Sequence, residues 1–276
     1  MAYQSGTSEE YLGRAIKEYG HREDVVIATK YTPKSDDFID SRTYLTECLN
    51  NSLRRLQTDY IDLYIMHMWD YRTPIEETLE ILNDFIKEGK IKEIGISNCF
   101  AYQLATANTI AKERGLQGFV SVQGHYNLIF REEEREMKRY CDEEGISMTP
   151  YSALASGRLA KHPGETSQRL EKDTYAKGKY DASSDLDLKI IQRVEKLASK
   201  HHVSMSEVSL SWLMSKVASP VVGATKLKHV DTAVLATELE LSEEEKQYLE
   251  EPYQPHPLVG VMATNTKEPL IFKGGQ

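Results

Sequence analysis

Residues 60–67 read Tyr60-Ile-Asp-Leu-Tyr-Ile-Met-His67, an apolar run that ends in a side chain able to do chemistry. The same design recurs, so that six runs with the composition of buried strands each end in a polar residue. They are Asp24–Lys30, Tyr60–His67, Ile91–Asn98, Phe119–Gln123, Met148–Tyr151 and Pro220–Lys226. In a barrel of parallel strands, catalytic groups sit at the carboxyl ends because the βα loops converge there. The terminal residues are therefore expected to face one site: Lys30, His67, Asn98, Gln123, Tyr151 and Lys226.

Amphipathic helical stretches separate the runs. Apolar residues at helical spacing, such as Leu45, Leu49 and Leu56, give each stretch one stripe to bury against a sheet. Further helices are predicted near 101–114, 131–144 and 186–201, whereas His162 to Ser184, with few apolar residues, favours a long loop. Alternation of strand and helix predicts a parallel sheet. The predicted fold class is α/β, a TIM-type (β/α)8 barrel in a single domain over residues 1–276.

Composition excludes several classes of function. The net charge of -9 over 276 residues argues against a non-specific nucleic-acid surface, which needs clustered cations. No run of about 18 uncharged apolar residues occurs, so we expect neither a membrane span nor a signal peptide. The three cysteines are odd in number and irregularly spaced, which indicates a reducing compartment. They form no Cys-x-x-Cys pair that would suggest a zinc site. A cytoplasmic protein is expected, and its oligomeric state stays open.

Seven segments in a characteristic order carry a resemblance to a known family. They are Tyr3–Gly13, Val26–Lys30, Asp62–His67, Gly95–Asn98, Gln123–Asn127, Pro150–Leu154 and Gly223–Lys226. In these segments the chain resembles the aldo-keto reductase superfamily, in its bacterial and channel-subunit-like branch. The resemblance implies a TIM barrel that binds NADPH without a Rossmann domain. It also implies hydride transfer to a small-molecule carbonyl substrate.

By position in the family's motifs, the catalytic roles fall on Tyr3, Lys30 and His67. A tyrosine near its reference pKa of about 10 is a poor acid at neutral pH. A neighbouring ammonium favours the tyrosinate and lowers that pKa, while an imidazole can orient the substrate oxygen. The resemblance thus implies Tyr3 as proton donor, Lys30 as its cationic neighbour and His67 as the orienting group.

The family's cofactor residues carry over in the same way. Ser97, Asn98 and Gln123 are expected to hold the nicotinamide carboxamide, and Tyr151 is expected to stack on the ring. Ser152, Leu154 and Gly157 correspond to the segment that cradles the pyrophosphate. Around the adenosine phosphate the resemblance implies Gly223, Ala224, Thr225, Lys226 and His229. Since Lys226 can pair with the extra phosphate as a point charge, NADPH is expected over NADH.

The chain departs from the family pattern at its start. The family has about two further strands before the motif with Tyr3, and an aspartate that pairs with the catalytic lysine. We therefore expect an N-terminally truncated barrel with about six of eight strands, through a misassigned start, a fragment or a truncated gene. Besides an NADPH-dependent reductase, two alternatives follow from this departure. They are a non-catalytic NADPH-binding regulatory protein, and a decay product that folds poorly.

Overall fold

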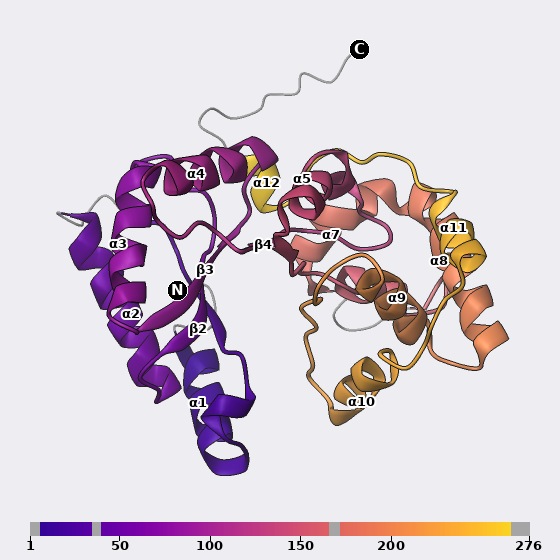
Figure 1. Cartoon of the computed structure of the whole chain (residues 1–276). Coiled ribbons are helices and arrows are strands. Elements are labelled where there is room, and N and C mark those ends of the chain that lie inside the picture. The colour runs from indigo at the N-terminus through magenta and orange to yellow at the C-terminus, as the bar shows by residue number, and fades with distance from the viewer. Residues whose placement is uncertain (1–5, 35–39, 166–171, 266–276) are drawn as a thin grey trace. The chain divides into compact units, whose positions relative to one another are not determined.

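The computed structural model describes residues 6–34, 40–165 and 172–265, which divide into two compact units (Figure 1). The first contains the described residues up to 122 together with Asn265, and the second contains residues 123–264. The strands of the described residues are β1 (Ala28–Tyr31), β2 (Ile61–Met66), β3 (Ile91–Ser97), β4 (Ser121–Gln123) and β5 (Ser147–Met148). The single domain predicted for residues 1–276 stays a prediction.

The first unit is a parallel sheet with helices between its strands. Its helices are α1 (Thr7–Tyr19), α2 (Ser41–Leu56), α3 (Ile75–Lys87) and α4 (Ala101–Glu113), with the short turn η2 (Arg22–Asp24). Strands β1, β2 and β3 are parallel neighbours and β4 follows them in order. Helix α2 contacts β1. It also contacts α3, which in turn contacts β3 and α4 (Figure 1). The predicted α/β class with a parallel sheet is confirmed.

The core of this unit lies between the sheet and the predicted helical stripes. Leu49 of α2, Leu79 of α3 and Ile94 of β3 are all fully buried. At Gly95 in β3, a Cβ atom would collide with the hydroxyl of Ser121 on β4 and press on the side chain of Ile65 on β2. Glycine therefore permits the close approach of side chains around the middle of the sheet.

A partly buried carboxylate, that of Glu9, helps attach helix α1 to the unit. Glu9 forms an ion pair with Arg55 of α2 at 2.6 Å and accepts a hydrogen bond from the hydroxyl of Thr29 in β1 at 2.7 Å. At Gly13 a Cβ atom would lie 2.5 Å from the carbonyl oxygen of Leu56, so α1 approaches the end of α2 closely. These contacts hold α1 beside β1, the strand that carries Lys30.

The second unit is mostly helical. Its helices are α5 (Met137–Glu144), α7 (Thr174–Tyr180), α8 (Ser184–His201), α9 (Met205–Met214), α10 (Leu227–Leu235), α11 (Glu243–Glu250) and α12 (Val261–Thr264). Short 3₁₀ turns are η3 (Glu132–Arg135), η4 (Ala155–Ala160) and η5 (Asp181–Ser183). The stretch from His162 to Ser184, predicted as a long loop, contains α7 and η5 in its described part. This prediction was wrong because Ala176 and Tyr180 are enough to bury one side of a short helix.

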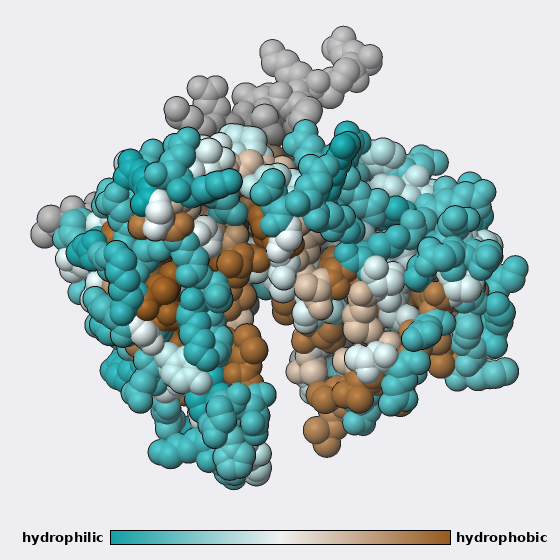
Figure 2. Space-filling model, in the orientation of Figure 1, coloured by the Kyte–Doolittle hydropathy of each residue, from teal (hydrophilic) through white to brown (hydrophobic). Residues whose placement is uncertain are grey.

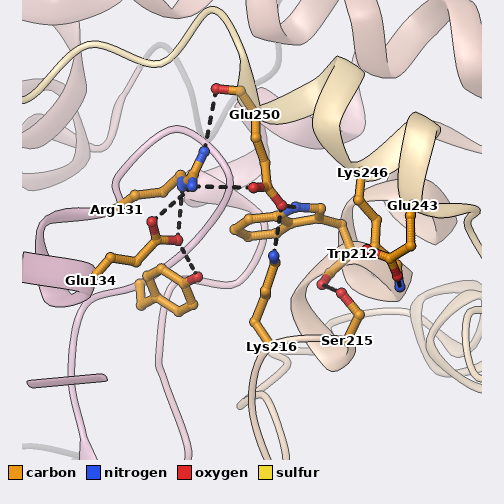
Figure 3. Close-up of polar contacts among 9 residues, drawn as sticks. Arg131, Glu134, Trp212, Ser215, Lys216, Glu243, Lys246 and Glu250 are labelled. Atoms are coloured by element: carbon orange, nitrogen blue, oxygen red, sulfur yellow. Dashed lines mark hydrogen bonds and ion pairs between the residues drawn. The ribbon is translucent and has the colours of Figure 1, made fainter. Parts of the chain in front are cut away.

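Trp212 of α9 lies at the centre of this unit and is fully buried. Its indole N–H donates to Glu250 of α11 at 2.8 Å, and Lys216 pairs with the same carboxylate at 2.8 Å (Figure 3). Arg131 donates to both carboxylate oxygens of Glu134, at 2.8 and 2.7 Å, and reaches Glu250 at 3.4 Å (Figure 3). Charged groups taken out of water are thus paired, as burial requires.

The sixth predicted strand run is a correction. Among the described residues five strands are present, and Pro220–Lys226 is not one of them. Val221 N–H donates to the carbonyl of Pro150 at 2.8 Å, so the run starts beside β5 in an extended path. The N–H of Ser219 likewise donates to the carbonyl of Met148 at 3.4 Å, so the pairing passes Pro220. Within the described residues it stops at Val221, and the chain enters α10 at Leu227. The closed barrel and the N-terminal truncation stay predictions.

Helix α10 exposes an apolar face. Leu227, Val230, Val234 and Leu235 are 84%, 49%, 57% and 49% exposed, and Figure 2 shows apolar surface over this helix.

None of the helices in the described part of the chain combines the length and the apolar character that a bilayer crossing requires.

Candidate functional site

Four predicted residues lie at the carboxyl edge of the first unit's sheet. Lys30 is the penultimate residue of β1, and His67 directly follows β2. Ser97 ends β3, and Asn98 comes after it. The register pairs Lys30 with Ile65 and Met66 with Ile96, so these strand ends are level with one another. The structure therefore brings Lys30, His67, Ser97 and Asn98 to the same edge, as the parallel pattern predicted.

Main-chain hydrogen bonds hold this edge in place. The His67 N–H donates to the carbonyl of Tyr31 at 2.8 Å, which extends the β1–β2 ladder by one residue. The side-chain amide of Asn98 donates to the carbonyl of His67 at 2.9 Å and to the hydroxyl of Ser97 at 2.9 Å. Asn98 adopts φ +50°, in the left-handed region that asparagine tolerates. These bonds set the orientation of a buried amide next to His67.

The environment of this edge shifts the pKa values of Lys30 and His67. Burial lowers the pKa of Lys30 from its usual value. Burial, and then the charge of Lys30, lower the pKa of His67 to about 4. At neutral pH the imidazole is therefore neutral and lies within electrostatic reach of the lysine. A neutral imidazole has one N–H to donate, and a neighbouring ammonium stabilises negative charge on oxygen.

Two further predicted residues lie together in the second unit. Gln123 ends β4, and the Tyr151 N–H donates to the carbonyl of Gly124 at 2.9 Å. The Gln123 amide donates to the hydroxyl of Thr149 at 3.4 Å, and His125 and Tyr151 form a parallel bridge. Gln123 and Tyr151 thus end neighbouring extended segments that run in the same direction.

The segment after Tyr151 has an unusual backbone. Ser152, Ala155 and Ser156 have φ of +61°, +47° and +55°, and Gly157 has φ of +101°. The N–H of Ala155 donates to the carbonyl of Ser152 at 2.8 Å, and that of Gly157 donates to Leu154 at 2.8 Å. Left-handed conformations cost roughly 1–2 kcal/mol per non-glycine residue and cluster at functional sites. Backbone of alternating handedness also forms concave anion-binding surfaces. This geometry fits the predicted pyrophosphate segment of Ser152, Leu154 and Gly157.

The predicted adenosine-phosphate residues surround the start of α10. Lys226 is its N-cap residue, and the N–H of Thr225 donates to the imidazole of His229 at 3.3 Å. Gly223, Ala224 and the other members of this segment are exposed. Tyr3, the predicted proton donor, lies outside the described residues. The described residues hold no group of three or more His, Cys, Asp or Glu side chains arranged for a metal ion.

A buried polar cluster beside Tyr151 escaped the sequence analysis. The His125 ring stacks on Phe130 at 4.1 Å and on Tyr151 at 5.6 Å between ring centres. Its Nε2 lies 2.7 Å from the hydroxyl of Tyr180, and the Asn127 amide donates to that hydroxyl at 3.2 Å. Burial, and then the charge of Lys179, lower the pKa of His125. His125 and Asn127 belong to a quoted segment, but nothing local to Tyr180 or Lys179 signals their proximity.

Comparison with known proteins identifies the family. Residues 1–254 match the model of the aldo/keto reductase family. An aldo-keto reductase of Fusarium vanettenii is 37% identical over 94% of this chain and 77% of its own length. The versiconal hemiacetal acetate reductase of Aspergillus parasiticus is 38% identical over 92% of this chain and 81% of its own length.

A solved structure has the same fold type. The crystal structure of a thermostable aldo-keto reductase in complex with the inhibitor epalrestat is similar, with a TM-score of 0.74 and 29% identity. The match covers 91% of this chain and 79% of that chain. The bacterial and channel-subunit-like branch stays a prediction. The matches in sequence and in structure agree, and the chain belongs to the aldo/keto reductase family.

Proposed function

We propose that this protein is an NADPH-dependent oxidoreductase that reduces the aldehyde or ketone group of a small molecule to an alcohol. The observation that carries the proposal is the pair of Lys30 and a neutral His67 at the carboxyl edge of β1 and β2, next to the buried amide of Asn98. Family membership supports the class of reaction. The edge offers a hydrogen-bond donor and a cation, which are the groups that a carbonyl oxygen needs as it gains charge.

Each residue has a defined part in the proposed reaction. When bound, a reduced nicotinamide supplies the hydride that forms the new C–H bond of the alcohol. The neutral imidazole of His67 donates its N–H to the carbonyl oxygen and orients it. The hydroxyl of Tyr3 gives its proton to that oxygen. The ammonium of Lys30 stabilises the tyrosinate that remains, until a proton from solvent restores the hydroxyl.

The residues present fit a nicotinamide nucleotide in two places. At the first, Ser97 and Asn98 are buried polar residues, 1% and 4% exposed, that suit a carboxamide. At the second, the segment from Ser152 to Gly157, in which four residues have positive φ, suits a pyrophosphate. We assign Gln123 to the carboxamide, Tyr151 to stacking on the ring and Lys226 to the extra phosphate of NADPH. A lysine there favours NADPH over NADH.

Loss of NADPH absorbance in the presence of aromatic aldehydes or quinones tests the proposal. We expect Lys30→Met and His67→Gln to lower kcat by about 10²- to 10⁴-fold, which is typical of a removed proton-transfer or electrostatic group. Lys17→Met is the matched control because Lys17 is exposed on α1, and it should leave turnover unchanged. Tyr3→Phe should behave like Lys30→Met.

The outcomes separate the alternatives. Turnover that survives in Lys30→Met and Tyr3→Phe would contradict the assigned roles. Tight NADPH binding with negligible turnover would instead favour a regulatory protein that binds the cofactor without catalysis. A chain that neither binds NADPH nor unfolds cooperatively would favour the decay product.

We also propose a cytoplasmic location. No disulfide joins Cys48, Cys99 and Cys141, and two of these three described cysteines are buried. Cysteines without disulfides are typical of reducing compartments, where disulfides are rare. Fractionation of cells that express a tagged chain would test this location.

A further inference from the structure

Lys179 of α7 is a buried cation that forms no ion pair within the described residues, although the charge of Asp173 acts on it and opposes the effect of burial on its pKa. The residue is 6% exposed, and none of the ion pairs in the described part of the chain includes it. Its neighbour Lys177, on the same helix, reaches solvent. Placing an ammonium out of water costs several kcal/mol unless other groups compensate. A lysine with this placement therefore has either a packing role or a binding role.

The contacts of Lys179 point to Tyr151 and Ser152. Its Nζ donates to the hydroxyl of Ser152 at 3.2 Å. The same atom lies 5.1, 5.7 and 5.4 Å from the ring centres of Tyr151, Tyr175 and Tyr180. Aromatic rings at this range give a cation part of the stabilisation that water would supply. Burial lowers the pKa of Lys179 to about 8, so the amine is still mostly protonated at neutral pH.

Ser152 begins the left-handed segment, and its carbonyl accepts a hydrogen bond from Asn127 at 3.0 Å. The ammonium of Lys179 therefore adjoins a backbone whose alternating handedness suits an anion. The side chain of Ser152 is held by Lys179 and its main chain by Asn127. A cation from a helix and a neutral amide donor from a loop thus meet at one residue, next to the ring of Tyr151.

We propose that Lys179 binds the pyrophosphate of the nicotinamide nucleotide at Ser152. The inference rests on the proposed function and adds to it a residue outside the seven segments. Phosphate is the anion that fits because a compact ammonium pairs with it as a point charge and the adjacent main chain can share the contact. Lys226 has a different role, at the extra phosphate, so the two lysines have separable effects.

Binding measurements on the full chain test the assignment. Lys179→Met should weaken both NADPH and NADH by at least about tenfold, as expected for loss of a charge-assisted hydrogen bond. Lys226→Met should weaken NADPH and leave NADH nearly unchanged. Lys177→Met is the matched control, since it removes a charge from the same helix at an exposed position, and it should bind as the parent chain does. Lys179→Arg keeps a cation and should bind more tightly than Lys179→Met.

Urea unfolding separates binding from packing. If Lys179 serves binding, Lys179→Met should keep or raise the unfolding midpoint, because the variant no longer buries a charge. A lower midpoint with unchanged affinity for both nucleotides would overturn the inference and leave the proposed function standing.

Inorganic pyrophosphate, measured by calorimetry, distinguishes failure of the inference from failure of the proposed function. Weaker pyrophosphate binding by Lys179→Met than by Lys177→Met would support the anion site directly. Pyrophosphate binding by a chain that binds neither nucleotide would overturn the nucleotide assignment. If the parent chain binds NADPH and Lys179→Met binds it equally well, the inference is wrong.

Discussion

Replacing His67 by glutamine is expected to remove an acid-sensitive contribution to the stability of the first unit. Burial, and then the charge of Lys30, lower the pKa of His67 from 6.5 to about 4. In the unfolded chain neither influence acts, so the imidazole takes up its proton near the usual pKa. The folded chain must instead keep the ring neutral or place a second cation beside Lys30.

The sign of the effect follows from proton uptake. Between the two pKa values the unfolded chain binds more protons, so stability rises with pH in this window. The contribution of the neutral ring is fully present above about pH 6.5 and is lost as the pH falls toward about 4. Between about pH 7 and about pH 5 the two values correspond to a loss of ~1.8 kcal/mol. His67 is only half-buried, and solvent screening reduces the expected loss to ~1 kcal/mol.

Urea unfolding at the two pH values, followed by tyrosine and tryptophan fluorescence, measures this difference. The parent chain should lose ~1 kcal/mol more than His67→Gln on acidification. His21→Gln removes an exposed imidazole from the same unit and is the matched control. Lys30→Met should raise the pKa of His67 in an NMR titration without restoring its usual value, because burial is the larger cause. Equal acid sensitivity of the parent chain and His67→Gln would refute the reasoning.

Two stability predictions follow from packing and from buried charge. Gly95→Ala should destabilise the chain by ~1–3 kcal/mol, because the new Cβ atom collides with the Ser121 hydroxyl. Gly178→Ala, which has open space around it in α7, should instead stabilise the chain by up to ~1 kcal/mol. Equal urea midpoints for the two variants would count against the close approach at Gly95. Arg131→Met should cost roughly 2–3 kcal/mol, because it leaves the Glu134 carboxylate without its buried cation (Figure 3). Replacing the exposed arginine, Arg139→Met, should lower the free energy of unfolding by less than ~0.5 kcal/mol. Similar losses for the two variants in urea unfolding would show that burial of the Arg131–Glu134 pair adds nothing to stability.

Local pattern was enough to predict most elements. Apolar runs predicted β1 to β5 in order, because a buried strand needs only a short apolar segment between polar ends. In the sequence, Ser204-Met-Ser-Glu207 and Ser242-Glu-Glu-Glu245 have the spacing of a capping box, and helices α9 and α11 begin there with both hydrogen bonds of the box formed. Thr7-Ser-Glu-Glu10 and Thr73-Pro-Ile-Glu76 have the same spacing, yet the N-cap residues of α1 and α3 are Gly6 and Pro74. A capping motif states which residues can cap a helix, whereas packing decides where the chain enters it.

Some parts of the candidate site could also be predicted from the sequence, and others could not. The alternation of strand and helix was enough to place Lys30, His67 and Asn98 at one sheet edge, since parallel neighbours end together. The run Pro220–Lys226 had strand composition, yet it forms no strand, because among the described residues its pairing with the segment after β5 stops at Val221. How far such a pairing extends depends on the neighbouring segment and not on composition.

By itself the sequence determined the family, the α/β class and the strand-end positions, since these depend on residue type and on spacing along the chain. Tertiary structure alone decided that Lys179 is buried against Ser152 and Tyr151, and that His67 stays neutral. Burial and charge act through space between residues far apart in the chain. No local pattern in residues 172–180 indicates that Lys179, of their three lysines, contacts a serine 27 positions earlier in the chain.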